Sequence, residues 1–157
     1  MKHYKQSDLA QMKDRERARF VNCLSGFKSA NVIGTRDRHQ QDNLAIVSSV
    51  VHLGSNPPFL GFIMRPQSVT RHTWENIEES GVYTINHVGE SFFKRAHKTS
   101  ARYPREQSEF DACDLTPEFM DGFHAPYVAE SSLRIGMQLF AAVAAPTSPP
   151  SSAFPPP

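Results

Sequence analysis

The stretch ANVIGTRDRHQQDNLAIVSSVVHLGSNPPFLGFIM, residues 30–64, decides the fold class of this chain. Short runs rich in β-branched residues occupy positions 30–35, 44–51 and 59–64, and polar breaks separate them. The second break, GSNPP at 54–58, consists of residues that favour turns. Short apolar runs bounded by such breaks are typical of strands joined through turns. We therefore expect three antiparallel strands in this stretch.

On either side of this stretch the sequence predicts helices and two further strands. Helices are indicated by apolar residues at helical spacing, by hydroxyl residues at candidate N-caps, and by Gly26 and Gly81 just past two of the ends. The expected helices span residues 7–24, 71–80 and 91–99, a short turn spans 116–121, and the expected strands span 82–88 and 132–143. Short strands interrupted by a few helices, without regular alternation of strand and helix, favour an antiparallel barrel or another α+β domain. The predicted fold class is therefore mainly β with helices (α+β).

The length and composition of the chain fit one folded domain followed by a tail of different character. A chain of 157 residues, 39% hydrophobic and 21% charged, is long enough to bury a core of its own. Residues 144–157 consist of Ala, Ser, Thr and Pro with one Phe, and their six prolines remove backbone donors. We expect a domain over residues 1–143 and a disordered tail over residues 144–157.

Charge and composition argue against several classes of function. The net charge of +1 and the pI near 7.9 are far from the basic balance of a nucleic-acid binder. The apolar runs are too short to cross a bilayer and the polar N-terminus has no signal-peptide core, so we expect a cytoplasmic protein without membrane contact. Cys23 and Cys113 lie outside any CxxC pattern and the seven histidines form no ligand cluster, so no metal site is expected.

The first stretch that carries chemistry is MRPQSVTRHTWENI at residues 64–77, which leaves a strand and enters a helix. The start of a helix offers unpaired backbone N–H groups and the positive end of the helix dipole. Arg65 and Arg71 would add cations for a bound phosphate, and Ser68 and Thr73 would add hydroxyl donors. From spacing alone, a helix cap with solvated arginines is the alternative interpretation and the favoured one.

The second stretch is NLAIVSSV at residues 43–50. Small and hydroxyl side chains stand where a flat strand would otherwise carry bulky groups, which would let a planar ring approach the backbone. The alternative is an ordinary core strand with two tolerated serines, Ser48 and Ser49. From the residues alone this alternative is favoured.

Several common enzyme motifs are missing from the sequence. It contains no GxGxxG after a strand, no GxxxxGK[ST] and no GxSxG, so no Rossmann dinucleotide site, P-loop or nucleophile elbow is predicted. No Cys/His pair is placed for nucleophilic catalysis. If the chain is an enzyme, we expect a bound cofactor to supply the chemistry.

A series of segments, in order along the chain, resembles the flavin reductase-like FMN-binding proteins. The likeness extends from about residue 20 to residue 138 and rests on SGFK at 25–28, VIGT at 32–35, NLA at 43–45, HLGSNPP at 52–58 with LGF at 60–62, RHT at 71–73 with NI at 76–77, YTIN at 83–86, and EFD at 109–111 with LTP at 115–117. This resemblance implies an FMN-binding split β-barrel that forms a homodimer and binds FMN near the subunit interface. Family members continue into a further core strand beyond the segment equivalent to residues 132–143, so the barrel is expected to be incomplete at its C-terminus.

The resemblance also implies which residues bind the cofactor. The Asn-Leu-Ala segment of the family maps to residues 43–45, and its basic residue and threonine at the helix start map to Arg71 and Thr73. No catalytic residue is assigned. The complete predicted FMN site consists of Asn43, Leu44, Ala45, Val47, Ser48, Ser49, Arg65, Ser68, Arg71, His72 and Thr73.

As to activity, the resemblance implies an FMN-dependent oxidoreductase that uses NAD(P)H to reduce flavin or a small acceptor. Without a Rossmann motif, the nicotinamide would stack directly on the flavin. The alternative is a non-enzymatic FMN-binding or flavin-storage protein, which the missing C-terminal segment makes more credible than usual. A weaker alternative is a fragment that binds nothing and only dimerises. His52 could line the acceptor side, although an ordinary structural histidine is the favoured interpretation.

Overall fold

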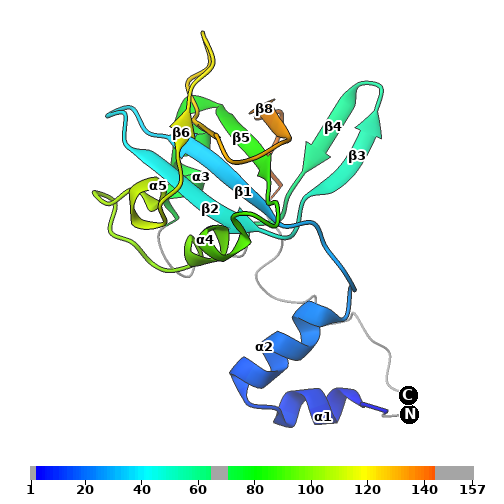
Figure 1. Cartoon of the computed structure of the whole chain (residues 1–157). Coiled ribbons are helices and arrows are strands. Elements are labelled where there is room, and N and C mark those ends of the chain that lie inside the picture. The colour runs from blue at the N-terminus through cyan, green and yellow to red at the C-terminus, as the bar shows by residue number, and fades with distance from the viewer. Residues whose placement is uncertain (1–2, 65–70, 144–157) are drawn as a thin grey trace.

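A four-stranded antiparallel sheet forms the centre of the computed structural model, which describes residues 3–64 and 71–143 (Figure 1). The sheet consists of β1 (Asn31–Arg36), β2 (Asp42–Val47), β5 (Val82–His87) and β8 (Arg134–Gln138), in the spatial order β2-β1-β5-β8. Two smaller antiparallel pairs are β3 (Val51–Ser55) with β4 (Pro58–Gly61), and β6 (Pro117–Glu118) with β7 (Tyr127–Val128). The antiparallel strands and the helices around them confirm the α+β class.

The register of the central sheet places β2 and β8 at its two edges. Strand β1 pairs with β2 from Asn31 opposite Val47 to Arg36 opposite Asp42, and β1 also pairs with β5 on its other side. Strand β5 pairs in turn with β8, from Val82 opposite Gln138 to Asn86 opposite Arg134. Because β2 is an edge strand, every second backbone N–H along it points away from the sheet.

The two faces of the sheet carry separate apolar cores. Consecutive residues of a strand point to opposite faces, and Val32 and Ile33 of β1 accordingly belong to different clusters. One face packs under α5 (Glu109–Ala112) and α4 (Phe93–Lys98), and its buried residues are Val32, Leu44, Phe92, Ala96, Phe110, Cys113, Leu115 and Val128. The other face packs against α3 (His72–Ser80), and its buried residues are Ile33, Ile77, Tyr83 and Ile85.

Helix α3 confirms the helix predicted over residues 71–80 and the glycine expected at its end. Arg71 has an extended conformation and its carbonyl accepts hydrogen bonds from the amides of Trp74 and Glu75, at 3.0 and 3.1 Å. Gly81 ends the helix in the left-handed conformation (φ +72°) and donates to the carbonyl of Ile77 at 2.9 Å. Arg71 is the N-cap residue of α3.

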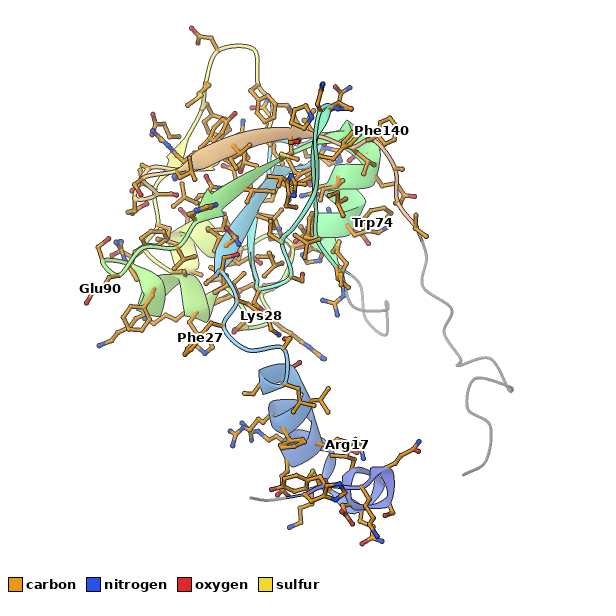
Figure 2. All side chains as sticks on the ribbon, turned by 90° about the vertical axis from the view of Figure 1, so that its right-hand side faces the viewer. Arg17, Phe27, Lys28, Trp74, Glu90 and Phe140 are labelled. Atoms are coloured by element: carbon orange, nitrogen blue, oxygen red, sulfur yellow. The ribbon has the colours of Figure 1, made fainter. Side chains whose placement is uncertain are left out.

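The helix predicted over residues 7–24 is instead two helices, α1 (Gln6–Gln11) and α2 (Asp14–Cys23). Met12 between them is extended (φ −65°, ψ 143°), and Arg17 Nη1 donates to its carbonyl at 3.3 Å, which satisfies an acceptor that the break leaves free. Neither helix contains a buried residue, and together they extend away from the sheet (Figures 1 and 2). We call residues 4–24 the helical arm.

The strand predicted over residues 44–51 is wrong in extent, because the chain leaves the sheet after Val47. The Ser49 hydroxyl accepts from the Ile63 amide at 3.1 Å and donates to the Ile63 carbonyl at 2.9 Å, so it ties the bend between β2 and β3 to the chain that follows β4. The projecting hairpin β3–β4 therefore begins where the prediction continued β2 (Figure 1).

Other boundaries also differ from the predictions. The strand expected over 132–143 spans only Arg134–Gln138, the helix expected over 91–99 spans Phe93–Lys98, and the turn expected over 116–121 contains β6. The tail predicted over 144–157 lies outside the described residues. In the described part of the chain, no helix is long and apolar enough to cross a membrane.

Candidate functional site

The start of β2 at Asn43 and the start of α3 at Thr73 lie against each other, although 30 positions separate them in the sequence. Asn43 Nδ2 donates to Thr73 Oγ1 at 2.9 Å, and both residues are buried, at 7% and 6% exposure. Two of the stretches predicted to bind FMN therefore meet at the start of β2. We call this meeting point the β2–α3 junction.

Buried amides and hydroxyls extend the β2–α3 junction into the sheet. Thr35 Oγ1 on β1 accepts from Asn43 Nδ2 at 3.3 Å and from Asn76 Nδ2 at 3.1 Å. These bonds hold the first turn of α3 against β1 and β2. The Oδ1 atom of Asn76 is buried without a hydrogen-bond partner in the described structure, so the junction retains an unused acceptor.

Arg71 begins α3 and carries an unused buried donor. Its Nε is buried and has no hydrogen-bond partner in the part of the chain that the structure describes, while the residue as a whole is half-buried. A buried guanidinium N–H at the start of a nine-residue helix suits an anionic ligand, because the helix dipole and the fixed charge act in the same direction. The donor set at this position therefore fits a phosphate group.

Glu109 of α5 belongs to the same site, although it is not among the residues predicted to bind FMN. Its Oε2 accepts the backbone N–H of Leu44 at 2.9 Å, and the residue is 8% exposed. Burial raises the pKa of Glu109, although the hydrogen bonds from the amides of Leu44 and of Glu109 itself and the nearby charge of His72 oppose that rise. The signal in the sequence was the family-like segment EFD at 109–111, which does not show what Glu109 binds.

His72 is the first residue of α3 and lies near Glu109. It is half-buried and lines a cavity of about 10 Å³ together with Asn43, Asn76 and Glu109. A cavity of that volume has room for roughly one water molecule and for no part of a flavin. His72 therefore contributes to the electrostatics of the β2–α3 junction rather than to an open pocket.

The other predicted residues that the structure describes lie further along the chain. Ala45 and Val47 are half-buried and lie on the same face of β2 as Asn43. Ser48 is exposed, and the hydroxyl of Ser49 is engaged by the Ile63 backbone. Arg65 and Ser68 lie outside the described residues, and His52 is exposed on β3.

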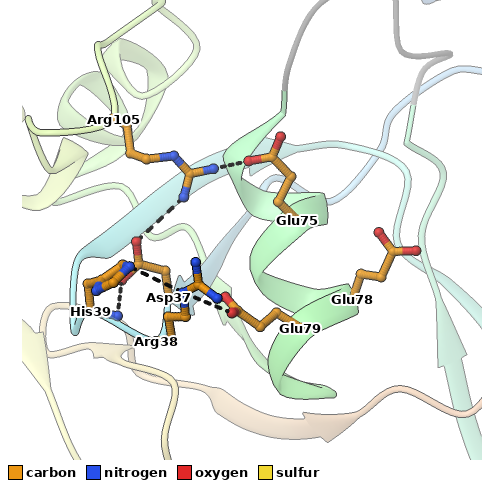
Figure 3. Close-up of a pocket in the computed structure, with 7 residues that line it drawn as sticks. All are labelled: Asp37, Arg38, His39, Glu75, Glu78, Glu79 and Arg105. Carbon is orange, nitrogen blue, oxygen red and sulfur yellow. Dashed lines mark hydrogen bonds and ion pairs between the residues drawn. The ribbon is translucent and has the colours of Figure 1, made fainter.

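A larger cleft of about 480 Å³ lies beside α3, and its lining is entirely charged or ionisable (Figure 3). Arg105 spans it, pairing with Asp37 at 3.5 Å and with Glu75, while Arg38 pairs with Glu79 at 3.5 Å. Burial raises the pKa of Asp37, but hydrogen bonds from the Gln41 and His39 amides and the charges of His39 and Arg105 outweigh it, so the net shift is downward. Such a lining offers no apolar wall for a flavin ring.

Comparisons with known proteins agree with the fold described above. The profile of the flavin reductase-like domain matches residues 24–148. A solved split-barrel protein from Shewanella frigidimarina NCIMB 400, assigned as a flavin reductase, is 52% identical, with a TM-score of 0.84 over 88% of this chain and 68% of that one. The split-barrel fold expected from the sequence is thereby confirmed.

Two further relatives are more distant. The FMN-binding domain of a flavin reductases-like enzyme from Shewanella baltica OS155 is 21% identical and has a TM-score of 0.62, over 73% of this chain and 59% of that one, which shows a shared fold. A protein from Aquifex aeolicus (strain VF5) of uncharacterized function is 26% identical over 100 residues, or 62% of this chain and 51% of that one. The chain thus spans about half the length of that curated relative.

Proposed function

The chain belongs to the flavin reductase-like domain family, and from this premise we propose that it binds FMN and uses NAD(P)H to reduce flavin or another small acceptor. The observation that carries the proposal is the buried, unused Nε donor of Arg71 at the start of α3. The FMN-binding domain from Shewanella baltica, which shares this fold, supports the choice of FMN.

The β2–α3 junction and the part of the chain that follows Asn43 on β2 would divide the binding of FMN between them. Arg71 and the first amides of α3 would hold the phosphate, because both present donors at the positive end of the helix. Ala45 and Val47 would allow the ring to approach β2, and the two serines beyond Val47, with Arg65 and Ser68 in the predicted loop, would complete the site.

Bound FMN would supply the redox chemistry by accepting a hydride from a reduced nicotinamide. The part of this chain would be to orient the ring on β2 and to hold the phosphate on α3. The hydrogen bond from Asn43 to Thr73 keeps these two elements in a fixed relation. A rigid relation of this kind is what positions a cofactor for reaction with a second substrate.

A titration with FMN and with riboflavin tests the proposal, because the two ligands differ by the phosphate alone. Each charge-assisted hydrogen bond contributes about 1.5–3 kcal/mol, so FMN should bind at least roughly tenfold more tightly than riboflavin. Arg71→Ala should remove most of this difference, whereas Arg102→Ala, at an exposed arginine, should preserve it. Equal affinities for both ligands in the unmodified protein would contradict the phosphate site.

Steady-state oxidation of NADH and NADPH with added FMN separates the enzyme from its alternative. Turnover would support the oxidoreductase. Tight FMN binding without turnover would favour the flavin-storage function instead.

We further propose a homodimer whose second subunit covers the hairpin β3–β4. Val51 and Leu53 on this hairpin are 46% and 67% exposed, and residues 43–64 contain no Asp, Glu, Lys or Arg. A lone two-stranded hairpin is marginally stable in water, and exposed strand edges are normally protected by charges. An uncharged, apolar hairpin is therefore suited to cover by a second copy.

A further inference from the structure

We propose that Glu109 is a positioning residue for FMN binding, which holds β2 in the place where the flavin would contact it. This inference rests on the proposed FMN site. It starts from the backbone of Leu44, whose N–H is bonded to Glu109 Oε2 at 2.9 Å and so points away from β1. Leu44 stands opposite Gly34, and the outward N–H groups of β2 are therefore those of Asp42, Leu44 and Ile46.

Glu109 Oε2 accepts the middle one of these three outward N–H groups, that of Leu44. A flavin edge that approached the outer side of β2 would meet the Leu44 N–H already bonded, whereas the Ile46 N–H, which also points outward, lies between Ala45 and Val47 in the strand. Glu109 thus restricts the place along β2 at which the backbone can bind the polar edge of a ring.

Two neighbouring residues of β2 are held by two different helices. The side chain of Asn43 bonds Thr73 of α3, and the backbone of Leu44 bonds Glu109 of α5. Since Arg71 begins α3, the position of the strand and the position of the phosphate donors are linked through two adjacent residues. A shift of β2 away from α5 would therefore move the ring site and strain the Asn43–Thr73 bond that links it to the phosphate donors.

The structure leaves Glu109 little freedom to move. Ser108 caps α5 by accepting the Phe110 amide at 3.2 Å, and Phe110 is 1% exposed in the same apolar cluster as Leu44. A glutamine would accept the Leu44 N–H in the same place without placing a charge in the interior. Burial of the carboxyl raises its pKa, so this charge is costly, and costly buried charges are common at functional sites.

The test compares FMN affinity with thermal stability in four variants. Glu109→Ala removes the acceptor, and Glu109→Gln keeps an acceptor of the same length. Val128→Ala is the control for lost packing. It creates a loss comparable to that of Glu109→Ala at a buried residue of the apolar cluster that contains Leu44, away from β2. Asp111→Asn removes an exposed charge two residues along α5.

We expect Glu109→Ala to weaken FMN binding at least tenfold in a fluorescence titration, and Glu109→Gln to stay within threefold of the unmodified protein. Val128→Ala should lower the melting temperature about as much as Glu109→Ala while changing FMN affinity less than threefold, and Asp111→Asn should change neither. If the alanine variant does not fold, Glu109→Met, which keeps the side-chain length without the acceptor, takes its place.

The inference is overturned if the Glu109 variants and Val128→Ala lose FMN affinity in proportion to their loss of stability, because Glu109 would then act through folding alone. It is also overturned if Glu109→Ala binds FMN normally. Those results would leave the proposed function intact. Failure of the unmodified protein to bind FMN would overturn both proposals, so the two failures are distinguishable.

Discussion

Replacing Thr73 by valine removes one oxygen atom from the β2–α3 junction and preserves the shape of the side chain. Thr73 Oγ1 is the acceptor for Asn43 Nδ2 at 2.9 Å, and both residues are buried. The variant therefore takes away the shorter of the two hydrogen bonds made by that amide nitrogen and leaves the bond to Thr35 Oγ1 at 3.3 Å.

The size of the effect follows from burial. A neutral hydrogen bond contributes about 0.5–1.5 kcal/mol, and a buried donor left without its partner costs roughly 1–3 kcal/mol. Because the longer bond to Thr35 remains, we expect the free energy of unfolding to fall by about 1–2 kcal/mol. For a domain of this length that corresponds to a decrease in melting temperature of roughly 3–8 °C.

Urea unfolding, followed by the fluorescence of Trp74 and by circular dichroism, measures the change. Trp74 is the single tryptophan and lies next to the substituted residue. Thr116→Val is the matched control, since its hydroxyl makes an exposed bond to Glu130 Oε1 at 3.3 Å, and we expect a change within about 0.5 kcal/mol. If Thr73→Val were no more destabilising than Thr116→Val, the junction would not contribute as described.

Three further predictions follow from other parts of the structure. Burial raises the pKa of Glu109, so the protonated carboxyl favours the folded state. This contribution to stability is fully present below the ordinary pKa of 4.5 and is lost as the pH rises through the raised pKa of the folded protein. Glu109→Gln should remove this part of the pH dependence in melting curves. Gly34→Ala should destabilise the fold by roughly 2 kcal/mol or more in urea unfolding, because the added methyl group would collide with the carbonyl oxygen of Pro126 and with Thr84; a change below about 0.5 kcal/mol would show that β1 can move away from them. Light scattering at micromolar protein should report a dimer, and Leu53→Lys should shift it toward monomer by placing a charge on the hairpin; a monomeric unmodified protein would contradict the homodimer.

Local signals in the sequence were sufficient for most elements of the fold. The helix over residues 71–80 could be predicted because apolar residues recur at helical spacing and Gly81 can adopt the positive φ that ends it. The strands at 30–35 and 82–88 could be predicted because β-branched residues favour extended backbone over a short window. The ordered series of family-like segments added the split barrel, which periodicity alone does not specify.

Only the tertiary structure decided where these elements meet and where some of them end. Strand β2 stops at Val47 because the Ser49 hydroxyl bonds the Ile63 backbone, a contact across 14 positions that no local window contains. Asn43 and Thr73 were both predicted as site residues, but their hydrogen bond depends on the packing of α3 against β1 and β2. Glu109 lies 65 positions from Leu44, and a lone acid after a serine does not show which amide it will bind. Sequence patterns report the local preferences of the backbone, whereas the partners of a buried polar group are set by long-range packing.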